Sequence, residues 1–237
     1  MGKGIEVHTF DLALNIARAA AAPTPWKALF AKAMILLDDM AARSGVDVHW
    51  TFGGGTVLML RHYHRLSKDI DIFVPDPQAL GYLNPRLGGI AESLTGRYEE
   101  SASHLKLLFL DGEIDFVASP NLTSPAFDNH VVEGRGVRLE TSAEIIAKKM
   151  WHRGQHAKAR DLFDLAMVIE REPVALAAAG PFLTKYRGEF LAQLDTRRDI
   201  LKLQFEQIDV LDFQATFDEC VAIAQSFLRS LPVSNEN

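Results

Sequence analysis

The feature that most constrains the fold is the order of segments between residues 46 and 74. Residues 46–52 are rich in β-branched and aromatic side chains and run into three glycines, Gly53–Gly55, which predicts a short strand ending in a tight turn. Helical spacing resumes over residues 56–63, and apolar residues then alternate over residues 70–74 as in a second strand. The chain therefore contains a strand, a glycine-rich turn, a helix and a strand in close succession.

Further elements are expected on both sides of this unit. Residues 26–43 repeat apolar side chains at three- and four-residue steps, which predicts a long amphipathic helix, and residues 85–94 also have a helical pattern. Two apolar runs, 105–110 and 113–118, flank Asp111-Gly112, a pair that is typical of a β-hairpin turn. We expect these runs to form paired strands.

The pattern changes near residue 140. Residues 131–139 predict one more strand, and Thr141 and Glu144 have the spacing of a capping box that opens a helix. The remainder has a helical pattern. We therefore predict an α/β (α+β) fold, with a core and N-terminal helices over residues 1–140 and a helical C-terminal region over residues 141–237.

Two acidic residues on the second expected strand form a candidate metal site. Asp69 and Asp71 are two residues apart and so project from the same face of a strand, with Ile70 pointing into the core. Like charges this close repel unless a proton or cation lies between them, and paired carboxylates suit Mg²⁺. Asp115, between two apolar residues of the hairpin, could supply a third carboxylate. The alternative is that Asp-x-Asp lies on an exposed strand with no metal role.

The glycine turn before the helix is a candidate phosphate site. Glycines let the backbone approach a ligand, and the N-terminus of the following helix presents free N–H groups. The alternative is an ordinary turn. A phosphate turn beside three carboxylates is typical of two-metal nucleotidyl transfer, in which Asp115 is the expected base or metal ligand on the side of the nucleophile.

These motifs resemble the AbiEii/AbiGii-type nucleotidyltransferases, the toxin half of bacterial type IV toxin–antitoxin and abortive-infection systems. The resemblance covers about residues 50–170. It rests on Gly54-Gly55-Thr56, Leu58, His64-Arg65-Leu66-Ser67, Asp69-Ile70-Asp71, Asp115, Lys149, and Arg160-Asp161 with Asp164. Gly53 and Tyr63 depart from the family's pattern, and neither departure removes a metal ligand.

The resemblance implies a polymerase-beta-like core with a mixed sheet and dependence on Mg²⁺, with two ions as a possibility. It also implies transfer of an NMP from an NTP to an acceptor, which is tRNA in studied relatives. Type IV antitoxins usually act without a stable complex, so no obligate partner is implied.

The resemblance also assigns roles to individual side chains. Lys149 joins Asp69, Asp71 and Asp115 as a catalytic candidate, with Arg153 one helical turn away. Asp161 or Asp164 is expected to orient Lys149 or Arg160, with a plain intrahelical ion pair as the alternative. The expected nucleotide- and phosphate-binding residues are Gly54, Gly55, Thr56, Arg65, Ser67 and Arg160.

Alternatives for the basic residues and histidines stay open. Arg65 could instead form a surface salt bridge, and Lys148 and Lys158 are expected to be solvated. His152 and His156 have the spacing of zinc ligands on a helix, but a third clear ligand is missing from the sequence pattern.

Composition restricts the classes of binding partner but does not identify one. The net charge of −6 argues against broad nonspecific affinity for nucleic acid, although a local basic cleft is compatible with it. A single cysteine excludes an internal disulfide, and the expected location is the cytoplasm, without membrane insertion. The leading hypothesis is that the protein transfers an NMP to an RNA acceptor. A small hydroxylated acceptor such as an antibiotic, and a catalytically silent NTP-binding module, are the alternatives.

Overall fold

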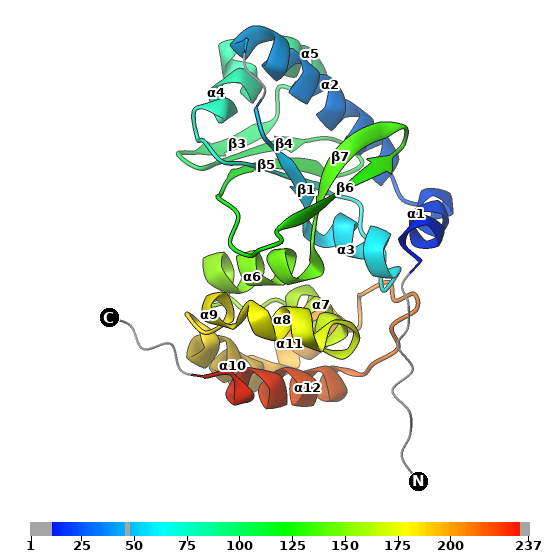
Figure 1. The fold of residues 1–237 in the computed structure, drawn as a ribbon, viewed down its shortest axis with the longest axis vertical. Coiled ribbons are helices and arrows are strands. Elements are labelled where there is room, and N and C mark those ends of the chain that lie inside the picture. Colours follow the sequence, from blue (N-terminus) through cyan, green and yellow to red (C-terminus); the bar gives the residue numbers. More distant parts are fainter. Residues whose placement is uncertain (1–10, 46–47, 233–237) are drawn as a thin grey trace.

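A computed structural model describes residues 11–45 and 48–232 of the chain. The part that carries the sheet and the part formed by the later helices lie one above the other (Figure 1). The strands are β1 (Thr51–Gly53), β2 (Ile70–Val74), β3 (Tyr98–Ser101), β4 (His104–Leu108), β5 (Glu113–Ala118), β6 (Phe127–Val132) and β7 (Arg135–Glu140). The α-helices are α1 (Leu12–Ala21), α2 (Trp26–Ser44), α3 (Gly54–His62), α4 (Ala79–Leu83), α5 (Ile90–Leu94), α6 (Ser142–Arg153), α7 (Ala159–Arg171), α8 (Pro173–Ala178), α9 (Gly180–Leu183), α10 (Arg187–Thr196), α11 (Arg198–Phe205) and α12 (Phe217–Ser230). Within this described part of the chain, no helix is long and apolar enough to cross a membrane.

The seven strands form one mixed sheet in the order β3-β4-β5-β2-β1-β7-β6. β2 is central: it pairs antiparallel with β1 and parallel with β5. This register places Asp71 opposite both Gly53 of β1 and Asp115 of β5. The mixed sheet and the C-terminal helices confirm the predicted fold class.

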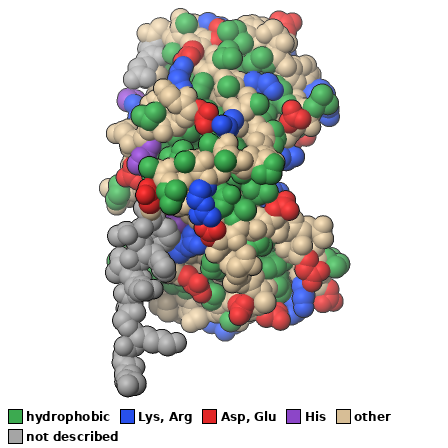
Figure 2. Space-filling view, turned by 90° about the vertical axis from the view of Figure 1, so that its right-hand side faces the viewer, with side chains coloured by type: hydrophobic (Ala, Val, Ile, Leu, Met, Phe, Trp, Pro, Cys, Tyr) green, Lys and Arg blue, Asp and Glu red, His purple; other side chains and the backbone are tan. Residues whose placement is uncertain are grey.

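The core lies on both faces of this sheet. β2 alternates buried Ile70, Ile72 and Val74 with half-buried residues, so its apolar side faces α2 while Asp71 faces the opposite side. α2 is long and buries one apolar stripe, as its three- and four-residue spacing predicts. On the face shown in Figure 2, acidic and basic side chains are interspersed and the outline narrows at mid-height.

Three local predictions differ from the structure, and one strand was not predicted. The expected helix over residues 85–94 is interrupted, because Gly88 and Gly89 adopt φ values of +81° and +80° between a 3-10 turn at Pro85–Leu87 and α5. The expected single strand at residues 131–139 is a hairpin, since β6 and β7 turn at Glu133-Gly134. β3 was not predicted. The first strand is shorter than expected and begins at Thr51, while residues 46 and 47 of the prediction lie outside the described residues.

The expected capping box at α6 is only half formed. The Thr141 side chain accepts a hydrogen bond from the Glu144 amide, as predicted. The Glu144 carboxylate instead accepts bonds from the amides of Leu122 and Thr123. Glu144 therefore holds the loop that precedes β6 against the start of α6.

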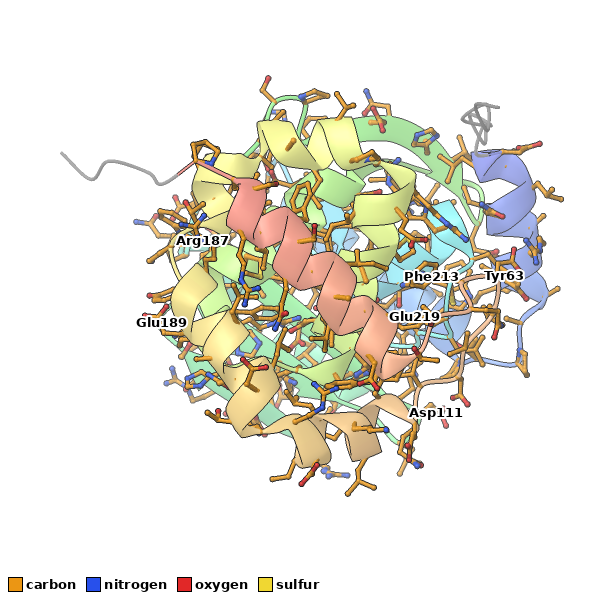
Figure 3. All side chains as sticks on the ribbon, turned by 90° about the horizontal axis from the view of Figure 1, so that it is seen from below. Tyr63, Asp111, Arg187, Glu189, Phe213 and Glu219 are labelled. Carbon is orange, nitrogen blue, oxygen red and sulfur yellow. The ribbon has the colours of Figure 1, made fainter. Side chains whose placement is uncertain are left out.

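The helical region is built around an aromatic cluster. Phe163 of α7 packs edge-on against Phe205 and Phe213, with ring centroids 5.5 and 5.2 Å apart. A complete capping box, Thr216 with Glu219, opens α12, which lies across the underside of the molecule close to Phe213 (Figure 3). The predicted boundary between residues 140 and 141 stays a prediction.

The segment after α11 returns to the sheet-bearing part. The amides of Leu211 and Asp212 donate to the carbonyls of His64 and Tyr63 at 2.9 and 3.0 Å. The Leu66 amide donates to the Asp209 carbonyl at 2.8 Å. This segment fixes the position of residues 63–66, which lead directly into the Asp-x-Asp strand.

Candidate active site

Asp71 and Asp115 lie side by side at the centre of the site. They are direct partners on the parallel strands β2 and β5, so both side chains leave the same face of the sheet. The Asp71 carboxylate also packs directly on Gly54, whose φ is +71° and which has no room for a Cβ. The glycine turn thus serves a specific purpose: it brings backbone, rather than a side chain, against a carboxylate.

The two carboxylates repel each other. Burial and the charge of Asp115 raise the pKa of Asp71 to about 7. Asp115 has polar neighbours: His104 Nε2 lies 2.8 Å from its Oδ1, and Lys106 Nζ lies 3.6 Å from its Oδ2. Asp71 therefore carries most of the unrelieved charge of the pair.

Asp69 is close to this pair but oriented differently. Its Oδ1 accepts a hydrogen bond of 3.2 Å from the Glu113 amide, at the start of β5. Across residues 11–45 and 48–232, no group of three or more His, Cys, Asp or Glu side chains is placed to hold a metal ion. The structure thus brings Asp71 and Asp115 together, while Asp69 is engaged by backbone.

The helix α6 forms the opposite wall of the site. Ile145, Lys148, Lys149 and His152 recur at three- and four-residue steps and line a cleft of about 230 Å³ together with Asp71 and Asp115. Arg153 also lines this cleft. Cationic side chains therefore face the two carboxylates across a space bordered by Gly54 and Gly55.

Lys149 is held by two buried carboxylates of α7. Its Nζ lies 3.0 Å from Asp161 Oδ1 and in contact with Asp164 Oδ2. Asp161 also accepts two bonds of 2.9 Å from Arg153. These pairs join different helices, so the intrahelical alternative does not describe them.

Asp164 connects this wall to the HRLS segment. Arg65 donates to both Asp164 oxygens, at 2.7 and 2.8 Å, and His64 Nε2 lies 2.8 Å from Oδ1. Burial opposes ionisation of Asp164, but Arg65 and Lys149 outweigh it and hold its pKa well below the ordinary value. Burial lowers the pKa of His64 to about 4, so His64 is neutral and donates an N–H to the carboxylate.

Lys148 belongs to a second buried network. Its Nζ lies 2.5 Å from Glu140 Oε1 and 3.9 Å from the centroid of the Phe73 ring. Thr51 donates to the same Glu140 oxygen at 2.7 Å. The expectation that Lys148 is solvated is wrong: the side chain is 3% exposed.

Three expected phosphate contacts are replaced by internal ones. Thr56 is fully buried and its hydroxyl donates to the Asp69 carbonyl at 2.6 Å. Ser67 Oγ lies 3.1 Å from Thr56 Oγ1. Arg65 forms a buried ion pair with Asp164, not a surface salt bridge, and its guanidinium packs against Gly55. These residues position the Asp-x-Asp strand rather than line the cleft.

Arg160 and the histidines also lie outside the expected arrangement. Arg160 lines a different groove, with Lys158 and Arg197. His152 contacts Ser119 Oγ at 3.0 Å, whereas His156 lines the same groove as Arg160, so the two do not share a site.

Sequence reasoning missed Lys148, Glu140 and His104. The signal for Lys148 is present, because Ile145, Lys148, Lys149 and His152 follow the helical period. His104 lies two residues from Lys106, the β4 partner of Asp115, and alternation along β4 puts both on the face of Asp115.

Comparison with known proteins identifies the family of this chain. The family described as "Nucleotidyl transferase AbiEii toxin, Type IV TA system" matches residues 35–229, which include both walls of the cleft. The chain belongs to the AbiEii family. No curated protein matches the sequence.

Solved structures with a similar arrangement have low sequence identity to this AbiEii protein. A candidate nucleotidyltransferase from H. pylori is 18% identical, with 93% of this chain and 96% of that chain covered and a TM-score of 0.44. JHP933 from Helicobacter pylori is 19% identical, with 93% and 94% covered and a TM-score of 0.42. The antibiotic-resistance factor ANT(2'')-Ia is 16% identical, with 70% of this chain and 95% of that chain covered and a TM-score of 0.45.

Proposed function

We propose that this AbiEii protein transfers an NMP from an NTP to an RNA acceptor, with tRNA as the acceptor class, and acts as the toxin of a type IV toxin–antitoxin system. The observation that carries the proposal is the register of Asp71 and Asp115 on neighbouring parallel strands, opposite Lys148, Lys149 and Arg153. One wall of the cleft suits a cation and the other suits a polyphosphate.

A divalent ion suits the donor set at the sheet wall. Asp71 and Asp115 offer adjacent carboxylate oxygens. Burial and then repulsion by Asp115 raise the pKa of Asp71, and a cation would relieve that repulsion. Asp69 would join them if its carboxylate left the Glu113 amide. Mg²⁺, when bound, lowers the pKa of an attacking hydroxyl and neutralises charge on the phosphates.

The protein's own side chains have separate tasks in this reaction. Lys149 and Arg153 bind the triphosphate electrostatically, and Asp161 and Asp164 fix the Lys149 ammonium in one place. Gly54 and Gly55 let the phosphates approach the backbone. The acceptor hydroxyl oxygen forms a bond to the α-phosphorus, the bond to pyrophosphate breaks, and Asp115 accepts the hydroxyl proton.

The test is transfer of label to RNA. The protein is incubated with Mg²⁺, total RNA and each α-labelled NTP in turn, and the RNA is separated by size. Label in the tRNA band from the wild-type protein, reduced by at least about 100-fold in Asp71→Asn, is the expected result. Activity that survives Asp71→Asn would refute the metal assignment, and NTP binding without label in RNA would favour a silent binding module.

The toxin role has a separate test. Induced expression of the wild-type protein is expected to arrest growth of a bacterial host, and Asp71→Asn expressed to the same level is not. Equal growth of the two cultures would contradict the toxin role without contradicting the chemistry.

A further inference from the structure

A second, larger groove lies beside the candidate active site and is lined mainly by basic and amide side chains. It encloses about 600 Å³, and its polar lining comes from His156, Lys158, Arg160, Arg197, Gln204 and Gln207. No carboxylate contributes to this lining, although the chain has a net charge of −6. A cationic groove on an acidic protein is not expected from average composition.

The cations of this groove are not neutralised by the protein. Within the described ranges, Lys158, Arg160 and Arg197 form no ion pair with a carboxylate. Arg197 donates to the neutral Gln193 side chain at 3.0 Å. By contrast, Lys149 and Arg153 in the cleft are paired with Asp161. The groove therefore has uncompensated positive charge available for an anionic ligand.

The groove adjoins the segment of the chain that leads into Asp69. Arg160 also lines a neighbouring depression with Ser67 and Lys68, the two residues that precede Asp69. The charges of Lys68 and Arg160 act on Asp69, whereas those of Arg153 and Lys149 act on Asp71. Asp71 shares the lining of the cleft with Lys149 and Arg153, whereas Lys68, which shares the lining of the depression with Arg160, directly precedes Asp69.

The first turn of α7 separates the two spaces. Arg160 lines the groove, while the adjacent Asp161 is buried and holds Arg153 and Lys149 in the cleft. A ligand in the groove and a nucleotide in the cleft would therefore lie on either side of one helical turn. Two substrates must meet at one reaction centre in a transfer reaction, and this arrangement provides one entrance for each.

We propose that the groove lined by Lys158, Arg160 and Arg197 binds the phosphate backbone of the single-stranded end of the RNA acceptor and guides its terminal hydroxyl towards the carboxylates of the active site. This inference rests on the proposed function. Spaced cations and amide donors without carboxylates match a phosphodiester strand, whose affinity comes mainly from charge neutralisation.

The test measures RNA binding without turnover. Binding of a fluorescein-labelled 12-nucleotide single-stranded RNA is followed by anisotropy, without NTP, as a function of salt, for the wild type and for Lys158→Gln/Arg197→Gln. We expect affinity to fall by roughly 10- to 100-fold at low salt and the slope of log K against log salt to shrink by about 1.4, since each single-strand phosphate contact contributes about 0.7.

A matched double variant controls for net charge. Arg97 and Arg229 are exposed and lie outside the groove, and Arg97→Gln/Arg229→Gln removes the same total charge. This variant is expected to bind RNA within about twofold of the wild type. Equal losses in the two double variants, or a wild-type protein that does not bind the RNA, would overturn the groove assignment.

Transfer kinetics separate this inference from the proposed function. With tRNA as acceptor, Lys158→Gln/Arg197→Gln is expected to raise the KM for tRNA by about tenfold or more and to leave the KM for the NTP unchanged. Transfer to tRNA with an unaltered KM for tRNA would refute the groove and leave the function intact. RNA binding that depends on the groove, without transfer of label, would refute the function and leave the groove.

Discussion

The two walls of the cleft handle buried charge in opposite ways. On the helical wall, Lys149 and Arg153 are held by Asp161 or Asp164 at hydrogen-bonding distance, and Arg65 of the HRLS segment also binds Asp164. On the sheet wall, Asp71 and Asp115 face each other, and repulsion with burial raises the pKa of Asp71 to about 7. We call the helical wall the paired wall. We call the sheet wall the unpaired wall after Asp71, which forms no ion pair within the described residues, although Asp115 beside it contacts His104 and Lys106. A cation would remove the electrostatic cost at Asp71.

This difference separates positioning residues from residues that contact ligands. The Arg65–Asp164 pair is buried and bidentate, so it fixes the distance between the HRLS segment and α7. Asp71 and Asp115 border open space instead. Within one motif, therefore, Arg65 supports the site and Asp71 is available for chemistry.

The largest expected effect is on the paired wall. Asp164→Ala leaves Arg65 and Lys149 without their shared carboxylate and should lower the free energy of unfolding by about 3–5 kcal/mol, measured by urea denaturation. The control is Asp212→Ala, whose exposed pair with Arg18 should contribute less than about 1 kcal/mol. Similar losses in both variants would contradict the distinction between buried and exposed pairs.

A substitution on the unpaired wall should raise the free energy of unfolding rather than lower it. Asp71→Asn removes the repulsion with Asp115 and should raise the free energy of unfolding by about 1–3 kcal/mol at pH 8. The folded pKa of Asp71 is raised to about 7, so the cost of ionising it grows as the pH rises from the unfolded pKa to the folded one, is complete above about pH 7 and decreases as the pH falls. The gain should therefore shrink at pH 5.5. A variant that is less stable than the wild type at pH 8 would contradict the assignment.

A divalent ion should stabilise the unpaired wall. Mg²⁺ at ten times its dissociation constant should add about 1.4 kcal/mol to the stability of the wild type at pH 8, seen as a rise in Tm. The effect should decrease below pH 7, because a proton on Asp71 competes with the cation. Asp71→Asn is the control, and an equal Mg²⁺ effect in that variant would place the ion elsewhere.

The smallest expected effect concerns His104. Its bond to Asp115 raises the pKa of His104, so the stability it contributes is present below the unfolded pKa and is lost as the pH rises through the folded one. His104→Gln keeps a side-chain donor and should change the free energy of unfolding by less than about 1 kcal/mol at pH 8, measured by urea denaturation. At pH 5.5 the wild type should gain relative to the variant. The absence of this pH dependence would show that the His104–Asp115 bond does not couple to protonation.

Much of the sheet could be predicted from local pattern, whereas chain breaks and hairpins could not. The helical spacing of residues 26–43 predicts α2, and the alternation over residues 70–74 predicts β2. The prediction of one helix over residues 85–94 is wrong, because apolar spacing continues through Gly88-Gly89 while the backbone does not. Short-range periodicity detects buried faces and does not register a change of direction.

The same division applies to the site. Sequence spacing put Asp69 and Asp71 on one face and suggested Asp115 as a neighbour, and the resemblance added Lys149. The sequence could not show that Arg65 and Thr56 form hydrogen bonds inside the protein. It also could not show that Lys148 is buried against Glu140. Residue type indicates what a side chain can bind, and only its neighbours in space decide what it does bind.

The order of residues alone determined the family, the mixed α/β class and the strand that carries the paired acids, because these depend on local spacing and on contiguous motifs. The parallel pairing of β2 with β5, which sets Asp71 beside Asp115, was decided by the tertiary structure. The tertiary structure also decided that Arg160 lies in a groove apart from the cleft. Both depend on segments distant in the chain, whose relative placement follows from the packing of the whole core.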